Sequence, residues 1–305
     1  MGGQRPILVG EVTSMVTQYN GIGAMLGPQW GPPSGAVQSR DEQINEHVTV
    51  RVYTPNGAEG ERLPLGVYFH GGGYIAGNLE FEDPICRIIA ENTPCIVVAV
   101  DYRLAPGFKL PTGINDGYDA FLWAHEKAGL LGADPNKVFS VGGSAGGGLA
   151  LSVADKLIRE GRRDLIKGVV ALNPITTHFD NPPEKYKDIY TSCVENATGV
   201  PIIDLHCMNV SYESSAAQPT DATVFVSISP NLTSYPPIYI ATCEKDILRD
   251  DGIVLEHMLQ DAGVKTKRDH YIGFPHYFFV FPSLPTGKLF LQNVVKGVRF
   301  VLGTE

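Results

Sequence analysis

The segment 138–160 constrains the fold of this chain more than any other. It consists of an apolar run at 138–141, then Gly-Gly-Ser-Ala-Gly-Gly-Gly at 142–148, then apolar residues at helical spacing. A strand that passes directly into a helix needs a sharp turn, and residues without a Cβ can form one. Ser144, with glycines two residues before and two after it, matches the nucleophile elbow. The following helix would direct its N-terminal N–H groups at the oxygen under attack.

The rest of the chain alternates apolar runs with helical patterns and has no internal repeat. This alternation is typical of β-α-β units, so we expect an α/β fold with a mostly parallel central sheet. Several runs are almost continuously apolar, as strands covered on both faces should be. The predicted strands are 48–53, 67–70, 95–100, 138–141, 169–172, 238–242 and 267–272, and the predicted helices are 113–129, 145–160, 250–262 and 286–302.

Two regions interrupt the alternation. Residues 1–45 are rich in Gly, Pro and Gln, and residues 175–235 are too long for a plain loop between two strands. We expect a single domain, 1–305, in which these two regions pack together as a lid over the carboxyl edge of the sheet. A tail and a decorated loop would be the alternative interpretation.

Composition narrows the possible partners. The chain has 305 residues and a formal net charge of −9, which argues against nucleic acid or an anionic membrane surface as the main partner. No apolar run approaches the length of a membrane span. No Cys/His/Asp/Glu cluster has metal-ligand spacing, so we expect neither a metal nor another cofactor. An odd number of scattered cysteines favours reduced thiols in the cytoplasm: Cys86, Cys95, Cys193, Cys207 and Cys243.

A serine nucleophile needs a base, and the base needs a carboxylate to orient it. In hydrolases with a strand–elbow–helix arrangement, the order along the chain is serine, acid, histidine. Asp246 follows the predicted strand 238–242 and would lie at the same sheet edge as the serine. Glu244, Asp250 and Asp251 are nearby rivals, although the last two suit the first turn of a helix.

His276 is the candidate base. It follows the predicted strand 267–272 in the turn Gly-Phe-Pro-His, so its imidazole can project from a loop. The other seven histidines break the expected order or lie elsewhere: His47, His125, His178 and His206 precede the acid, His70 lies in a glycine loop, His257 in a predicted helix and His270 in a predicted strand.

A second glycine-rich run, His-Gly-Gly-Gly at 70–73, follows the predicted strand 67–70. Such a loop can direct backbone N–H groups at a developing oxyanion, and the N–H of Ala145 would add another donor. The same run also fits a loose dinucleotide fingerprint with Asp101 at the end of the next strand. That fingerprint needs a helix at once, whereas Asp-Pro at 83–84 delays it.

Five motifs together carry a family resemblance: His-Gly-Gly-Gly at 70–73, Asp-Tyr-Arg-Leu-Ala-Pro at 101–106, the elbow at 142–147, Asp-Ile-Leu-Arg-Asp at 246–250, and the histidine loop at 273–278. In this order they resemble the hormone-sensitive-lipase group of α/β-hydrolases, from about residue 47 to 300. The resemblance implies an α/β-hydrolase fold with a helical lid, a triad of Ser144, Asp246 and His276, and oxyanion donors from Gly72, Gly73 and Ala145.

The chain departs from that group at two positions. Gly143 stands where an aspartate is frequent, and Ile247 stands where a proline usually follows the triad aspartate. Neither change removes a catalytic atom, but the first removes a carboxylate beside the elbow. By the same resemblance, Asp101 and Arg103 are structural and tie a strand to its loop.

The resemblance implies a serine carboxylesterase that hydrolyses small-acyl esters through an acyl-enzyme, with a secondary metabolite as one candidate substrate for deacetylation. The alternative is a non-hydrolytic enzyme on the same scaffold: a cyclase, acyltransferase or lyase. The C-terminal helix leaves a homodimer open, because its apolar residues suit a core or a dimer contact equally: Leu289, Phe290, Val294, Val295 and Val298.

Overall fold

One eight-stranded sheet organises the molecule, in the strand order β1-β2-β4-β3-β5-β6-β7-β8. The computed structural model describes residues 6–57, 60 and 62–305. Strand β2 runs antiparallel to both of its neighbours, and every other pair is parallel. This confirms the predicted α/β fold with a mostly parallel sheet. The strands are β1 Val37–Gln43, β2 Thr49–Pro55, β3 Leu63–Phe69, β4 Ile96–Asp101, β5 Ala133–Gly143, β6 Gly168–Leu172, β7 Ile238–Lys245 and β8 Thr266–Pro275.

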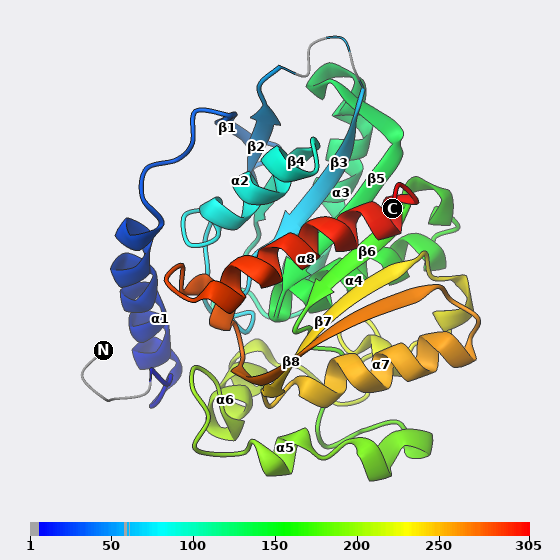
Figure 1. The fold of residues 1–305 in the computed structure, drawn as a ribbon. Helices are drawn as coiled ribbons and strands as arrows, with labels where there is room; N and C mark the ends of the chain where they lie inside the picture. Colours follow the sequence, from blue (N-terminus) through cyan, green and yellow to red (C-terminus); the bar gives the residue numbers. More distant parts are fainter. Residues whose placement is uncertain (1–5, 58–59, 61) are drawn as a thin grey trace.

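Helices cover both faces of the sheet (Figure 1). α2 and α8 pack together in front of it, and α3 and α4 pack together behind it. The α-helices are α1 Val12–Leu26, α2 Asp83–Asn92, α3 Thr112–Leu131, α4 Ala145–Arg159, α5 Ser192–Glu195, α6 Leu205–Ser215, α7 Arg249–Asp261 and α8 Pro285–Leu302. Short 3₁₀ helices are η1 Gly27–Trp30, η2 Arg163–Leu165, η3 Glu184–Ile189, η4 Val226–Ile228, η5 Leu232–Ser234 and η6 Phe278–Val280.

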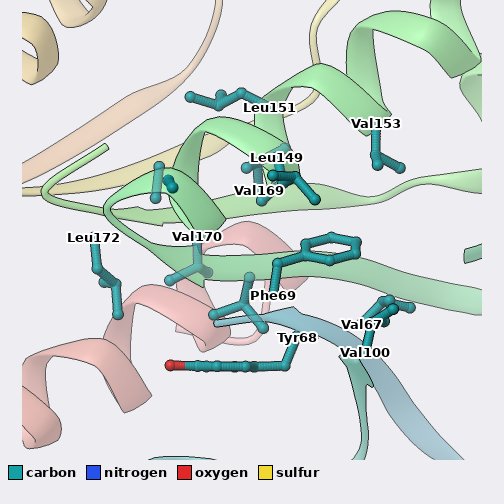
Figure 2. Close-up of a cluster of buried hydrophobic side chains, with 14 of the residues drawn as sticks. Val67, Tyr68, Phe69, Val100, Leu149, Leu151, Val153, Val169, Val170 and Leu172 are labelled. Atoms are coloured by element: carbon teal, nitrogen blue, oxygen red, sulfur yellow. The ribbon is translucent and has the colours of Figure 1, made fainter. Parts of the chain in front are cut away.

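The central strands and α4 share one apolar core (Figure 2). The strands are buried on both faces, which is why their sequences read as continuous apolar runs rather than alternating ones. α4 is buried along almost its whole length, because it lies directly behind β5 and β6. The cluster drawn in Figure 2 includes Val67, Phe69, Leu149, Val169 and Leu172. This core fixes the carboxyl ends of β3 and β5, where the two glycine-rich runs begin.

Strand β1 was not predicted. Its sequence, Val-Gln-Ser-Arg-Asp-Glu-Gln, is polar and mostly exposed, and it pairs only along one side with β2 at the sheet edge. A strand with so little burial has no apolar signal. Residues 37–43 therefore belong to the sheet, whereas the whole segment 1–45 was expected to belong to a lid.

Of the rest of 1–45, the segment 6–36 contacts the insertion 175–235, and residues 1–5 lie outside the part of the chain that the structure describes. Leu8 donates its N–H to the carbonyl of Ile202 (3.1 Å), and Ile202 donates to the carbonyl of Pro6 (2.6 Å). Helices α1 and α6 are in contact as well. Two segments almost 200 residues apart in sequence are therefore in contact.

The apolar face of the C-terminal helix α8 packs against the core. Phe290, Val294 and Val298 are completely buried, and Val295 is nearly so, while Leu289 is about half exposed at 48%. Their burial comes from packing against the sheet and against η6. Among the described residues, no helix combines the length and the apolarity that crossing a membrane requires.

Candidate active site

The serine of the elbow lies in a strained turn between β5 and α4. Ser144 has φ 54° and ψ −122°, a backbone conformation that residues other than glycine rarely adopt. The residues two positions before and two positions after it must be glycines, because the turn leaves no room for a Cβ there. A Cβ at Gly146 would lie 2.0 Å from the carbonyl oxygen of Phe69, and one at Gly142 would lie 2.3 Å from the carbonyl oxygen of Gly146.

The structure brings Ser144, His276 and Asp246 into one chain of hydrogen bonds. His276 Nε2 lies 3.0 Å from Ser144 Oγ, and His276 Nδ1 lies 2.7 Å from Asp246 Oδ2. All three side chains are buried. The acid follows β7 and the histidine follows β8, so both reach the serine from the carboxyl edge of the sheet. A neutral imidazole in this position can accept the proton of a serine hydroxyl.

Two further donors fix the carboxylate of Asp246. The N–H of Leu248 donates to Oδ1 (2.9 Å), and the side-chain amide of Asn173 donates to Oδ2 (3.0 Å). Asn173 follows β6 and has φ 47°, a left-handed conformation that asparagine tolerates better than most residues. Asn173 was not predicted from the sequence. Its position directly after a buried strand, at the same edge as the serine, was the available signal.

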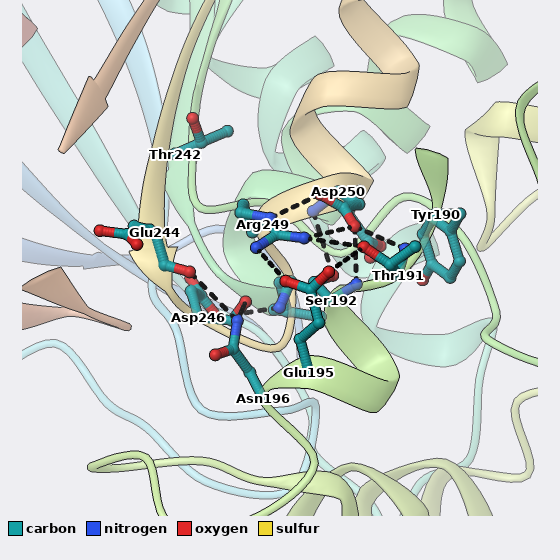
Figure 3. Close-up of polar contacts among 12 residues, drawn as sticks. Tyr190, Thr191, Ser192, Glu195, Asn196, Thr242, Glu244, Asp246, Arg249 and Asp250 are labelled. Atoms are coloured by element: carbon teal, nitrogen blue, oxygen red, sulfur yellow. Dashed lines mark hydrogen bonds and ion pairs between the residues drawn. The ribbon is translucent and has the colours of Figure 1, made fainter. Parts of the chain in front are cut away.

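The rival acids have other partners (Figure 3). Asp250 accepts the N–H groups of Thr191 and Ser192 and pairs with Arg249. The amide of Asn196 donates to the carbonyl oxygen of Asp246 (2.9 Å). These contacts dock the segment 190–196 onto the loop that carries the acid, so they hold that loop in place.

Asp251 and Glu244 also have hydrogen-bond partners other than His276. Asp251 accepts the N–H groups of Thr176 and Thr177 at 2.8 and 2.9 Å, and the hydroxyl of Tyr190. Burial raises the pKa of Asp251 to about 7, although these donors oppose the shift. Glu244 accepts the N–H of Gly273 at 2.7 Å. None of the three rivals makes the contact to His276 that Asp246 makes.

The His-Gly-Gly-Gly loop lies beside the serine. Gly72 and Gly73 both have positive φ, 120° and 64°, and a Cβ on Gly72 would lie 2.1 Å from the carbonyl oxygen of Ala76. Both glycines line the same cavity as Ser144. Ala145 is the first residue of α4 and follows the serine directly. The arrangement can present backbone N–H groups to an oxyanion bound at the serine.

His70 is part of the loop's support. Its ring stacks on Tyr102 with centroids 4.2 Å apart, and the Tyr102 hydroxyl donates to the His70 carbonyl oxygen (2.8 Å). Burial lowers the pKa of His70 to about 4, so the ring is neutral near pH 7. Arg103 lies directly after Tyr102, beyond the end of β4, and forms a bidentate pair with Asp116 of α3. Helix α2 begins at Asp83, well after the loop, so the dinucleotide fingerprint lacks the helix that it needs.

A mostly apolar cavity opens onto the serine and the histidine. Helices α1 and α6 form one wall of the cavity. Met15, Tyr19 and Ile22 line it from α1, and Cys207, Met208 and Ser211 line it from α6. The expected lid segments therefore line the cavity in which a substrate would meet Ser144.

Comparison with known proteins gives the family. A family model described as alpha/beta hydrolase fold matches residues 66–280. The versiconal hemiacetal acetate esterase of Dothistroma septosporum is 40% identical over 302 residues, covering 98% of this chain and 92% of that protein. The esterase of Pyrobaculum calidifontis superimposes with a TM-score of 0.86 at 28% identity, covering 97% of this chain and 95% of that one.

A third relative has a different activity in its name. The crystal structure of vibralactone cyclase gives a TM-score of 0.89 at 27% identity, over 98% of this chain and 91% of that one. The matched region includes both glycine-rich runs and all of the triad candidates. The chain belongs to the α/β-hydrolase family and, within it, to the hormone-sensitive-lipase-like carboxylesterases that its motifs resemble.

Proposed function

We propose that this esterase hydrolyses short-acyl esters with Ser144 as nucleophile, His276 as general base and Asp246 as the acid that orients the histidine. The observation that carries the proposal is the pair of contacts Ser144 Oγ–His276 Nε2 at 3.0 Å and His276 Nδ1–Asp246 Oδ2 at 2.7 Å. The geometry falls within hydrogen-bonding reach at both steps, which a serine nucleophile requires.

In the first half-reaction, His276 Nε2 takes the proton of Ser144 as Oγ attacks the ester carbonyl. The tetrahedral oxyanion is held by the N–H groups of Gly72, Gly73 and Ala145. His276 then gives its proton to the leaving alcohol, and an acyl-enzyme remains on Ser144. Water, deprotonated by His276, attacks the acyl carbon in the second half-reaction, and the acid leaves as Ser144 recovers its proton.

The proposed substrate class is an acetate, or a similarly short acyl ester, of an apolar alcohol. The apolar lining of the cavity supports an apolar alcohol, since a buried polar group without a partner would be costly there. The relative from Dothistroma septosporum, an acetate esterase, supports the acetyl group. In this proposal the segments 6–36 and 175–235 form the lid, and α1 and α6 decide which esters fit.

Replacement of the nucleophile tests the proposal. Ser144→Ala is expected to lower kcat on p-nitrophenyl acetate by three or more orders of magnitude, because only oxyanion binding remains. Ser152→Ala, a buried serine on the same α4, is the matched control and should keep activity. Near-normal turnover by Ser144→Ala would contradict the mechanism.

A cyclase is the second candidate function, and the similarity to vibralactone cyclase favours it. In such a reaction a hydroxyl of the acyl group, rather than water, would attack the acyl carbon. Product analysis separates the two functions. Hydrolysis releases one free acid per ester consumed, whereas cyclisation releases a lactone and no free acid.

We also propose that the protein works in the cytoplasm. All five cysteines are free and four of them are buried, which suits a reducing compartment. Cell fractionation with a detecting antibody tests this, and recovery in a secreted or membrane fraction would contradict it. The proposed partner is a small ester, and the net charge of −9 disfavours nucleic acid.

A further inference from the structure

Tyr277, the residue after the candidate base, fills the space beside the elbow. A Cβ at Gly143 would lie only 1.9 Å from the Tyr277 hydroxyl oxygen, and a Cβ at Gly71 would lie 2.5 Å from it. The phenol therefore passes between the turn that carries Ser144 and the glycine loop. Because glycine has no Cβ, Gly143 leaves room for this ring.

The hydroxyl of Tyr277 reaches a buried carboxylate. Glu82 is only 2% exposed, and its Oε1 accepts two hydrogen bonds: one from the N–H of Gly71 (2.8 Å) and one from the Tyr277 hydroxyl (3.2 Å). Its Oε2 accepts a third from the hydroxyl of Tyr68. A single carboxylate oxygen thus joins the glycine loop to the residue that follows His276.

The surroundings of Glu82 disfavour its charged form, so the carboxylate adds little to the stability of the fold near pH 7. Burial raises the pKa of Glu82 to about 7, and the three hydrogen bonds only partly oppose that shift. Among the described residues, no lysine or arginine forms an ion pair with it. Glu82 precedes α2, yet its side chain caps no N–H of that helix. A buried carboxylate without a cation is costly, so its hydrogen bonds to the two loops are its distinctive feature.

We propose that Glu82 and Tyr277 form a positioning pair, in which the carboxylate holds the glycine loop and the histidine loop in register for ester hydrolysis. The inference rests on the function proposed above. Neither side chain is assigned a proton transfer or a contact with the reacting ester carbonyl. The N–H groups of Gly72 and Gly73 stabilise an oxyanion only when they point at the place where it forms. Gly71 precedes Gly72 and Tyr277 follows His276. A displacement of the Glu82 carboxylate would therefore move both the oxyanion donors and the general base.

Three variants separate positioning from general stability. Glu82→Leu leaves the Gly71 N–H and the Tyr277 hydroxyl without their acceptor, and should lower kcat roughly ten- to a hundredfold with KM almost unchanged. Glu82→Gln keeps an oxygen at Oε1, so it should restore most of kcat. Tyr277→Phe removes only one hydroxyl and should lower kcat about tenfold.

Tyr68→Phe is the matched control. It removes a buried hydroxyl that bonds the same carboxylate, but Tyr68 lies in β3 and adjoins neither His276 nor Gly72. It should lower the Tm as Tyr277→Phe does while keeping kcat within about threefold of the wild type. If Glu82→Leu does not fold, the comparison of the two Tyr→Phe variants carries the test.

The outcomes are distinguishable. Equal kcat in Tyr277→Phe and the wild type would overturn the inference, and so would a Glu82→Gln variant as slow as Glu82→Leu. In both cases the wild type still hydrolyses p-nitrophenyl acetate, and the proposed function stands. A wild type that hydrolyses no ester and forms no fluorophosphonate adduct on Ser144 would instead remove the proposed function, and the inference with it.

Discussion

At the scale of single residues, the candidate site depends on side chains that hold its members as well as on the members themselves. Asp246 would be free to rotate without Leu248 and Asn173, each of which donates to one of its oxygens. Such supporting contacts determine whether the imidazole has the right tautomer and orientation. Leu248 lies two residues after Asp246, whereas Asn173 lies 73 residues before it, so a motif around the acid does not include Asn173.

Asn173 offers a clean test of this support. Glycine tolerates the φ of 47° at this position, so Asn173→Gly removes the amide without straining the backbone. We expect kcat to fall about tenfold, because Asp246 loses a donor, and the Tm to fall as well, because a buried carboxylate oxygen loses a hydrogen bond. Asn173→Ala adds backbone strain and should lower the Tm as well. Unchanged kcat in Asn173→Gly would show that the amide has no part in orienting Asp246.

Glu82 makes stability depend on pH. Its pKa is raised in the folded protein from the ordinary 4.5 to about 7, so the folded state binds this proton more tightly than the unfolded state. Its contribution to stability is complete below about pH 4.5 and is lost as the pH rises towards 7. The free energy of unfolding of the wild type should therefore fall relative to Glu82→Gln across this range, by at most about 3 kcal/mol.

Urea denaturation at pH 5 and at pH 7 measures this effect. Asp251, whose pKa burial also raises to about 7, contributes equally to both proteins, so the difference between them reports on Glu82. Parallel stability curves for the wild type and Glu82→Gln would contradict a raised pKa at this carboxyl.

At the scale of elements, the carboxyl ends of the strands gather the chemistry and two distant segments cover it. β5, β7 and β8 end at the serine, the acid and the histidine. α1 and α6 contribute the opposite wall of the cavity. Because these helices line the cavity that holds Ser144 and lie outside the alternating strands and helices of the sheet, they are the natural place for substrate choice.

Met15 of α1 tests that role. It is almost completely buried and lines the cavity, so Met15→Trp should fill space there. We expect kcat/KM for a p-nitrophenyl hexanoate to fall at least tenfold more than for the acetate. Met25→Trp is the control, since Met25 lies on the same helix but is 42% exposed. An equal effect of Met15→Trp on both esters would argue against α1 as a wall of the substrate cavity.

At the scale of the whole molecule, the sequence predicted what short-range patterns encode. Apolar runs located the buried strands, and the glycine runs located the turns that present Ser144 and the 70–73 loop. β1 was not predicted because a polar edge strand has no apolar pattern. α1 was not predicted because it has few buried residues and packs against α6, which is far away in sequence. The links among Glu82, Tyr277 and Gly143 were not predicted either, since nothing local indicates that these three meet.

The proposed mechanism depends on Ser144 as the nucleophile. Incubation with a fluorophosphonate, followed by intact and peptide mass spectrometry, shows which residue is the nucleophile. We predict one adduct per chain, located on Ser144, formed at least a hundredfold more slowly in His276→Ala. Ser144 is not the nucleophile if the adduct forms on another residue, or if no adduct forms on a protein that still hydrolyses p-nitrophenyl acetate.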